Sequence, residues 1–176
     1  ANALAGKRIA VYQHSTVARD LMVEICEGLG AEVLALGRSE IFIPVDTEAI
    51  RDEDVALAKQ WAAEHNVDAI ISADGDGDRP LISDEQGSWL RGDVAGILCA
   101  NYLGIEALAT PVSSNSAVEK SQLFKAVERT RIGSPFVIAA MQQLQQDYRS
   151  VAGYEANGGF LLASDVTHDG RSIGAL

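Results

Sequence analysis

Cysteine, long apolar segments and basic side chains are all scarce in this sequence, and each scarcity excludes a class of protein. Two cysteines, Cys26 and Cys99, are too few for a disulfide-rich secreted domain. Both lie among apolar residues in predicted helices, so we expect buried, reduced thiols in a cytoplasmic protein. No apolar run approaches the roughly 20 residues that cross a bilayer. The N-terminal ANALAGKRIA also lacks the apolar stretch of a signal peptide, so we expect neither membrane insertion nor export.

The shortage of basic residues limits the ligands that the chain can bind. Lysine and arginine number 14 against 25 aspartates and glutamates, which gives a net charge of −11. Residues 1–90 contain 7 basic and 17 acidic side chains, whereas residues 91–176 contain 7 and 8. A chain without a basic stripe is poorly suited to nucleic acid or anionic lipid, so we expect neither as a partner. A phosphate ligand must instead be met by a few placed groups or by a bound cation.

Segments with the apolar periods of strands and helices alternate along the chain. In the first half they predict strands at 7–13, 31–37 and 67–73, helices at 16–30 and 52–66, and a hairpin at 80–90. In the second half they predict helices at 92–104, 113–120 and 134–148, strands at 106–112 and 123–133, and a strand-turn-strand unit at 150–164. This alternation predicts an α/β fold of two tandem three-layer α/β/α domains with mixed, largely parallel sheets. The pattern restarts near Gly92, so we place the domains at residues 1–91 and 92–176.

Residues 71–80, ISADGDGDRP, place three aspartates within five positions directly after the predicted strand at 67–73. We call residues 74–79 the aspartate loop. Two carboxylates about 4 Å apart repel by roughly 4 kcal/mol at an effective dielectric constant near 20. The loop must therefore either splay into water or surround a positive group. Ligands of α/β folds gather at the carboxyl ends of strands, which is where Asp74 lies.

Four interpretations of the aspartate loop compete. A solvated acidic turn explains one Asp-Gly pair but not the alternation over five positions. A calcium loop of the EF-hand type requires glycine at the position of Arg79 and a preceding helix, although Glu85 has the expected spacing. A phosphatase loop of the haloacid dehalogenase type has a hydroxyl or branched residue where Asp78 stands. A magnesium site completed by a phosphate fits best, with Arg79 offering its guanidinium to a phosphate or sugar oxygen.

The sequence Asp-Gly-Asp-Gly-Asp-Arg after a strand resembles the metal loop of the α-D-phosphohexomutases, the phosphomannomutase/phosphoglucomutase family. Three later stretches agree with that family in order and spacing: LRGDVAGILCANYL, ERTRIGSPFV and GYEANGGF. The resemblance covers essentially the whole chain and identifies it with the middle two of the four family domains. It implies that Asp74, Asp76 and Asp78 hold Mg²⁺ and that the substrate is a hexose phosphate.

The resemblance also implies what this chain leaves to other parts of a longer protein. The phosphoserine loop with its Ser-His-Asn signature belongs to the first domain, the phosphate-binding loop belongs to the fourth, and neither motif occurs here. The third domain is expected to be truncated at its C-terminus. We therefore expect an isomerase of the phosphotransferase type, with phosphomannomutase favoured over phosphoglucomutase, whose isolated 176-residue piece is inactive because phosphoryl transfer depends on positioning and charge neutralisation. The alternative is a non-catalytic metal- or sugar-binding module.

In the second half, GYEANGGF is similar to the family's sugar-recognition loop. Glu155 and Asn157 stand at alternate positions, followed by Gly158, and a carboxylate and an amide suit adjacent sugar hydroxyls. Taken alone, this stretch predicts an ordinary hairpin turn, since Asn-Gly is a favoured hairpin dipeptide. The family often has histidine where Gly159 stands, which leaves any contact from that position in doubt. The resemblance also places Arg131 and Ser134 near the sugar phosphate.

The sequence does not identify a general acid or base. His14, His65 and His168 match no catalytic position of the family, and we expect them at the surface. His14 follows the first predicted strand, so a minor role in a cleft stays open.

Overall fold

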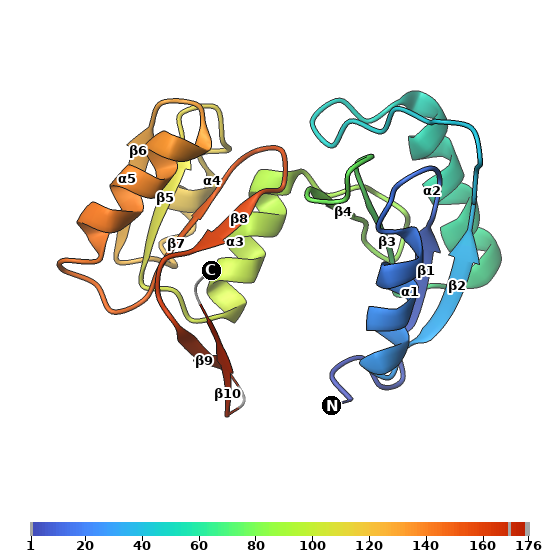
Figure 1. Cartoon of the computed structure of the whole chain (residues 1–176), viewed down its shortest axis with the longest axis horizontal. Helices are drawn as coiled ribbons and strands as arrows, with labels where there is room; N and C mark the ends of the chain where they lie inside the picture. The colour runs from blue at the N-terminus through green and yellow to red at the C-terminus, as the bar shows by residue number, and fades with distance from the viewer. Residues whose placement is uncertain (1, 169, 175–176) are drawn as a thin grey trace. The chain divides into compact units, whose positions relative to one another are not determined.

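The computed structural model describes residues 2–168 and 170–174 and separates into two compact units, which we call unit 1 (residues 1–90) and unit 2 (residues 91–176). Each unit is a four-stranded sheet with helices packed against it, as predicted (Figure 1). None of the helices in the described residues is long and apolar enough to cross a membrane.

The sheet of unit 1 has the strand order β2-β1-β3-β4. The strands are β1 (Arg8–Tyr12), β2 (Glu32–Leu36), β3 (Ala69–Ala73) and β4 (Pro80–Ile82), and the helices are α1 (Arg19–Gly28) and α2 (Asp52–His65). Strand β1 lies in the centre, parallel to β2 and β3, and β4 is antiparallel at the edge. Side chains alternate between the faces of a strand. Ala10 and Tyr12 therefore share one core with Ala58 and Ala62 of α2, whose small size lets the helix approach the sheet closely.

Unit 2 repeats this topology with the strand order β6-β5-β7-β8. The strands are β5 (Ala107–Pro111), β6 (Ala126–Thr130), β7 (Val151–Tyr154) and β8 (Phe160–Leu162), and the helices are α3 (Gly92–Tyr102), α4 (Ala117–Lys120) and α5 (Ser134–Leu144). A two-stranded ribbon follows, made of β9 (Val166–His168) and β10 (Arg171–Ile173). Leu108 packs on the α3 side of the sheet, whereas Ala107 and Ala109 pack on the α5 side.

Because the two sheets are alike, their functional loops occupy equivalent places. In both units the central strand pairs in parallel with the third strand, and the third strand pairs antiparallel with an edge strand. The connection between third strand and edge strand is the aspartate loop in unit 1 and residues 155–159, which we call the EANGG turn, in unit 2.

Several expectations from the sequence were wrong in detail. The helix predicted over 16–30 is shorter, and its apolar row is exposed to solvent, with Val17 76%, Leu21 56% and Ile25 50% exposed. Cys26 is buried as expected, but Cys99 is exposed, and both are free thiols. His14 is fully buried and not at the surface. The side chain of His168 lies outside the described residues.

Candidate functional site

The three aspartates of the aspartate loop gather around one point. One carboxylate oxygen from each of Asp74, Asp76 and Asp78 lies within 4.8 Å of the others. The Asp74 side chain is 14% exposed, whereas that of Asp78 is 71% exposed. This is the one acidic cluster of this kind that the described residues form. Glu85, which a calcium loop would require as a ligand, does not belong to it.

Asp74 is the anchored member of the group. Its Oδ1 accepts hydrogen bonds from the backbone amides of Gly77 (3.2 Å) and Arg79 (3.3 Å). Its own amide donates to the carbonyl of Arg79 (3.2 Å), which closes the loop on itself. Oδ2 of Asp74 takes no part in these bonds and lies 4.0 Å from the Nε of Arg79.

Gly77 is required by the packing of the aspartate loop. Its φ is 83°, and a Cβ at this position would lie 2.8 Å from the Cβ of Ala18. The amide of Val17 also donates to the carbonyl of Gly75 (3.1 Å). The aspartate loop is therefore supported by the β1–α1 connection, with glycine at the contact because any side chain would push the two segments apart.

The electrostatic state of the aspartate loop favours a cation. Burial, followed by the charges of Asp76 and Asp78, raises the pKa of Asp74, although hydrogen bonds from the Arg79 and Gly77 amides act in the opposite direction. The Nε of Arg79 lies 4.0 Å from Asp74 and 3.9 Å from Asp78, so its guanidinium offsets part of the repulsion.

The donor set fits a small hard cation. Mg²⁺ binds oxygen at about 2.1 Å, so two oxygens on opposite sides of the ion are about 4.2 Å apart. Modest rotations of the exposed Asp76 and Asp78 side chains would bring the three carboxylates from their present spacing, within 4.8 Å, into one coordination sphere. Carboxylates alone leave several of the six positions for water or phosphate oxygens.

His14, for which the sequence left a minor role in a cleft open, contacts the strand that leads into the aspartate loop. Its Nε2 lies 2.8 Å from the carbonyl oxygen of Ala73, the last residue of β3, and its Nδ1 has no hydrogen-bonding partner within the described chain. Burial lowers the pKa of its imidazole, although the Ala73 carbonyl opposes this effect. A lone histidine in the stretch QHST carries no periodic signal, so sequence analysis had no means of predicting that it is buried.

In unit 2, the EANGG turn is held by its own backbone. The amide of Glu155 donates to the carbonyl of Gly159 (3.0 Å), and the amide of Gly158 donates to the carbonyl of Glu155 (3.2 Å). Asn157 Oδ1 accepts from the amide of Gly159 (2.9 Å). A Cβ on Gly159 would lie 3.1 Å from Asn157 Oδ1 and 3.9 Å from Glu155 Oε2. The two polar side chains therefore flank Gly159.

The start of α3 forms the support of the EANGG turn. A Cβ on Gly92, the first residue of α3, would lie 2.3 Å from the backbone nitrogen of Gly158 and 2.5 Å from the carbonyl oxygen of Ala156. Contacts of this length with backbone atoms leave no room for any side chain. The helix and the turn can pack at this distance only with glycine at position 92.

Arg131 and Ser134 lie on the connection from β6 to α5. Ser134 is the first residue of α5, and Gly133 before it has a φ of 120°. The guanidinium carbon of Arg131 lies 5.8 Å from the centre of the Phe136 ring. Because β6 and β7 both run parallel to β5, this connection and the EANGG turn emerge at the same edge of the sheet.

Arg129, close to Arg131 in the sequence, has a structural role. Its guanidinium forms two bonds to Glu119 (2.6 and 2.9 Å) and also donates to the carbonyls of Pro111, Ser114 and Asn115. All of these hydrogen bonds lie within unit 2.

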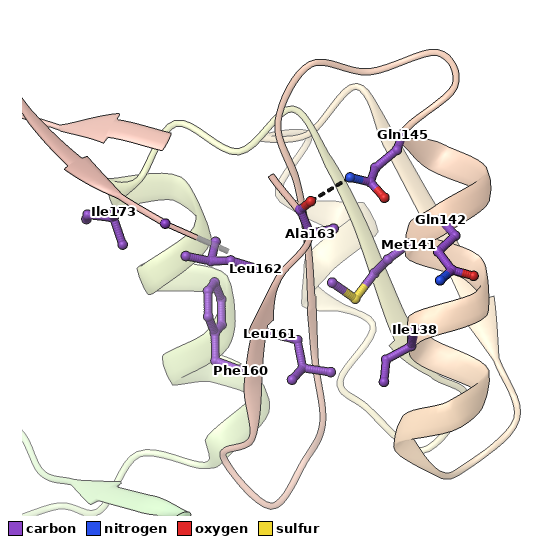
Figure 2. A pocket seen from close by; sticks show the side chains of 10 residues that line it. Ile138, Met141, Gln142, Gln145, Phe160, Leu161, Leu162, Ala163 and Ile173 are labelled. Carbon is purple, nitrogen blue, oxygen red and sulfur yellow. Dashed lines mark hydrogen bonds between the residues drawn. The ribbon is translucent and has the colours of Figure 1, made fainter. Parts of the chain in front are cut away.

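A cavity of about 500 Å³ lies between α5 and β8 (Figure 2). Met141, Leu161 and Ile138 line it, and Gln145 at its rim donates to the carbonyl of Ala163 (2.5 Å). It contains no acid, base or nucleophile and none of the residues predicted from the sequence to bind a ligand. It therefore offers no chemistry for a reaction.

Comparison with known proteins gives one consistent result. Residues 1–87 match the family model described as phosphoglucomutase/phosphomannomutase, alpha/beta/alpha domain II, and residues 91–175 match the model for domain III. A phosphomannomutase of Salmonella muenchen is 53% identical over 173 residues, and one of Sinorhizobium fredii is 49% identical over 174 residues. A phosphoglucosamine mutase of Rhizobium meliloti is 29% identical. The alignments with the two phosphomannomutases cover 98% of this chain but 36% of each relative.

Solved structures share the fold at low sequence identity. A phosphoglucomutase/phosphomannomutase family protein from Burkholderia thailandensis superposes with a TM-score of 0.68 at 16% identity, covering 96% of this chain and 36% of that one. The N-acetylphosphoglucosamine mutase of Aspergillus fumigatus, solved in complex with GlcNAc-6P and magnesium, gives a TM-score of 0.61 at 16% identity, covering 91% and 36%.

Proposed function

The chain belongs to the phosphoglucomutase/phosphomannomutase family, and from this premise we propose that it is the metal- and sugar-binding part of a phosphomannomutase. The proposed reaction moves a phosphoryl group between O1 and O6 of a hexose through a bisphosphorylated sugar. The observation that carries the proposal is the gathering of Asp74, Asp76 and Asp78 at the carboxyl end of β3. Since the chain spans about a third of its curated relatives, 36% of their length, this activity is proposed for the longer protein.

We assign the three aspartates to Mg²⁺. Bound there, the ion would neutralise negative charge on a phosphoryl group, which is the main electrostatic need of such a transfer. Asp74 supplies a fixed oxygen because two backbone amides hold its other oxygen. The guanidinium of Arg79 neutralises part of the loop's charge and can turn to a phosphate oxygen, since its side chain is 48% exposed.

We assign hexose recognition to unit 2. Glu155 and Asn157 would accept and donate hydrogen bonds to sugar hydroxyls, with the backbone of Gly158 completing the turn. Arg131 and Ser134 emerge at the same sheet edge and would contact the phosphate of the sugar, with the N-terminus of α5 beside them. The proposal places the second family domain at residues 1–91 and the third at residues 92–176.

Mannose is favoured over other hexoses by the comparisons. The two relatives near 50% identity are named phosphomannomutase, whereas phosphoglucosamine mutases align at about 30%. A cytoplasmic location belongs to the proposal as well, because Cys26 and Cys99 are free thiols and reducing compartments keep thiols in that state.

Calorimetric titration with Mg²⁺ and Ca²⁺ tests the metal assignment. We expect weak binding of Mg²⁺, because the phosphate ligand is not supplied by this chain, and no clear preference for Ca²⁺. A strong preference for Ca²⁺ would instead support the alternative of a non-catalytic binding module. An assay of the isolated 176-residue chain with mannose 1-phosphate and a hexose bisphosphate activator should give no turnover. Turnover in that assay would refute the division of the catalytic groups among several domains.

A further inference from the structure

In each unit, one buried side chain holds the backbone carbonyl that precedes the functional loop. In unit 1 the Nε2 of His14 lies 2.8 Å from the carbonyl oxygen of Ala73, directly before Asp74. In unit 2 the Oγ1 of Thr110 lies 2.9 Å from the carbonyl oxygen of Tyr154, directly before Glu155. His14 comes two residues after the end of the central strand β1, Thr110 lies near the carboxyl end of the central strand β5, and both side chains are 0% exposed.

The protonation state of His14 follows from its partner. A carbonyl oxygen only accepts hydrogen bonds, so Nε2 carries the proton and donates it. Burial lowers the pKa of the imidazole, and in its neutral form the unpartnered Nδ1 carries no proton. His14 also has a φ of 20°, which residues other than glycine adopt sparingly. The Ser72 hydroxyl also approaches the Ala73 carbonyl, but at 3.5 Å, and its shorter bond of 2.8 Å is to the carbonyl of Tyr12.

His14 and Arg79 hold the two polar ends of the peptide unit that leads from β3 into the aspartate loop. The peptide unit between Ala73 and Asp74 is planar, so it is fixed once both of its polar ends are held. His14 holds its carbonyl oxygen, and the carbonyl of Arg79 accepts from its N–H (3.2 Å). With this plane held, the direction in which the backbone enters Asp74 is restricted, and the Gly77 and Arg79 amides hold its carboxylate.

His14 also connects the aspartate loop to a third segment. Its backbone carbonyl accepts a hydrogen bond from the amide of Ser39 (3.0 Å), in the β2–α2 connection. The ring of Tyr12 packs against the imidazole with 5.0 Å between ring centres, and the Tyr12 hydroxyl donates to the buried carboxylate of Asp54 (2.8 Å). The imidazole is therefore held by its surroundings before any ligand arrives.

We propose that His14 is a positioning residue of the metal site: its imidazole, through the Ala73 carbonyl, sets the orientation of Asp74 toward the cation. Thr110 has the same relation to the EANGG turn, with the Ser114 hydroxyl (2.8 Å) donating to it while it donates to Tyr154. The effect of His14 on metal affinity rests on the proposed magnesium site, whereas its effect on the order of the aspartate loop does not.

Three variants of the 176-residue chain test this proposal. His14→Leu removes the donor, His14→Gln places an amide nitrogen near the position of Nε2, and Thr110→Val removes the matched donor of unit 2. Hydrogen exchange would be followed at the amides that hold each loop, namely Asp74, Gly77 and Arg79 in unit 1 and Glu155, Gly158 and Gly159 in unit 2. The affinity for Mg²⁺ would be measured by calorimetry at a temperature where all variants are folded.

One buried hydrogen bond corresponds to a factor of about 3 to 10 in an equilibrium constant. We expect His14→Leu to accelerate exchange of the unit 1 amides and to weaken Mg²⁺ binding by about that factor, with His14→Gln close to the wild type. Thr110→Val should accelerate exchange in the EANGG turn and leave Mg²⁺ affinity within about twofold. The proposal is refuted if His14→Leu changes neither quantity, if His14→Gln is as impaired as His14→Leu, or if Thr110→Val has the same effect on the aspartate loop.

A measurement on the wild-type chain covers the case in which His14→Leu does not fold. Nitrogen NMR of the imidazole should show the tautomer protonated at Nε2, and the tautomer protonated at Nδ1 would overturn the proposal. A wild type that binds no Mg²⁺ would refute the metal assignment alone, and the exchange rates would still decide the role of His14.

Discussion

The two units use the same sheet for two different kinds of loop. In unit 1 the connection after the third strand holds three carboxylates around one point, beside a half-exposed arginine. In unit 2 the equivalent connection is a turn held by its own backbone, with one carboxylate and one amide. The strand pairings that lead to both loops are identical in kind. The difference teaches that the same sheet positions two loops whose residues offer different groups to a ligand.

The largest loss of stability is expected when one tightly packed glycine in each unit is replaced by alanine. A Cβ on Gly87 would lie 2.3 Å from the carbonyl oxygen of Ala58 in unit 1, and one on Gly92 would lie 2.3 Å from the nitrogen of Gly158 in unit 2. We expect Gly87→Ala and Gly92→Ala each to destabilise their own unit by about 3 kcal/mol, because backbone atoms must move. Gly28→Ala in α1 meets no atom within 4 Å and should be neutral or slightly stabilising.

The two tryptophans make this measurement selective. Trp61 and Trp89 both lie in unit 1, so tryptophan fluorescence during urea unfolding follows unit 1, whereas circular dichroism follows both units. Gly87→Ala should shift the fluorescence transition to a lower urea concentration. Gly92→Ala should leave the fluorescence transition unchanged and shift only the part of the dichroism transition that comes from unit 2. Equal shifts of the fluorescence transition by both variants would contradict the independence of the two units.

Removing one carboxylate from each loop should sharpen the comparison. Asp74→Asn keeps the shape of the side chain but lowers the charge of the anchored ligand, so we expect Mg²⁺ affinity to fall by at least about tenfold, or about 1.4 kcal/mol. Glu155→Gln should leave Mg²⁺ affinity within about twofold and weaken binding of mannose 1-phosphate instead. Calorimetry with each ligand checks both expectations, and a similar loss of Mg²⁺ affinity in both variants would refute the separation of roles.

Acid should destabilise unit 2 through Glu106, and we expect this effect to be smaller than those above. Its side chain accepts hydrogen bonds from Lys125 (2.8 Å) and from the amide and guanidinium of Arg149, and the Lys125 bond, followed by that amide, lowers the pKa of Glu106 to about 2. A folded-state pKa below the ordinary 4.5 stabilises the fold above about pH 4.5, and this contribution is lost as the pH falls toward 2.

The matched variant Glu106→Gln removes that contribution at neutral pH. Its unit 2 should be less stable than the wild type at pH 7, and its stability should fall less between pH 4.5 and pH 2. Thermal unfolding followed by circular dichroism over this range measures the difference. An unchanged slope with pH would mean that Glu106 is equally protonated in the folded and unfolded states.

The sequence was informative where a physical rule acts locally. The strands and helices follow from apolar period, and the place of Asp74 follows from the rule that ligands meet the carboxyl ends of strands. The sequence was uninformative where tertiary contacts decide. Arg129 and Glu119 are ten positions apart and pair only after β6 and α4 pack. His14 contacts Ala73 across 59 positions, and the helical period of Val17, Leu21 and Ile25 does not specify whether that row is buried.

The close approach of Gly92 to the EANGG turn limits which residues can replace this glycine. Residue 92 begins a helix, has backbone atoms of the turn as the nearest neighbours of an added Cβ, and carries no side chain that a hexose could meet. Any larger residue there would nevertheless reshape the turn that is proposed to bind the sugar. A mutation at this position would therefore resemble a defect in substrate choice, although its cause would be the lack of space for one methyl group.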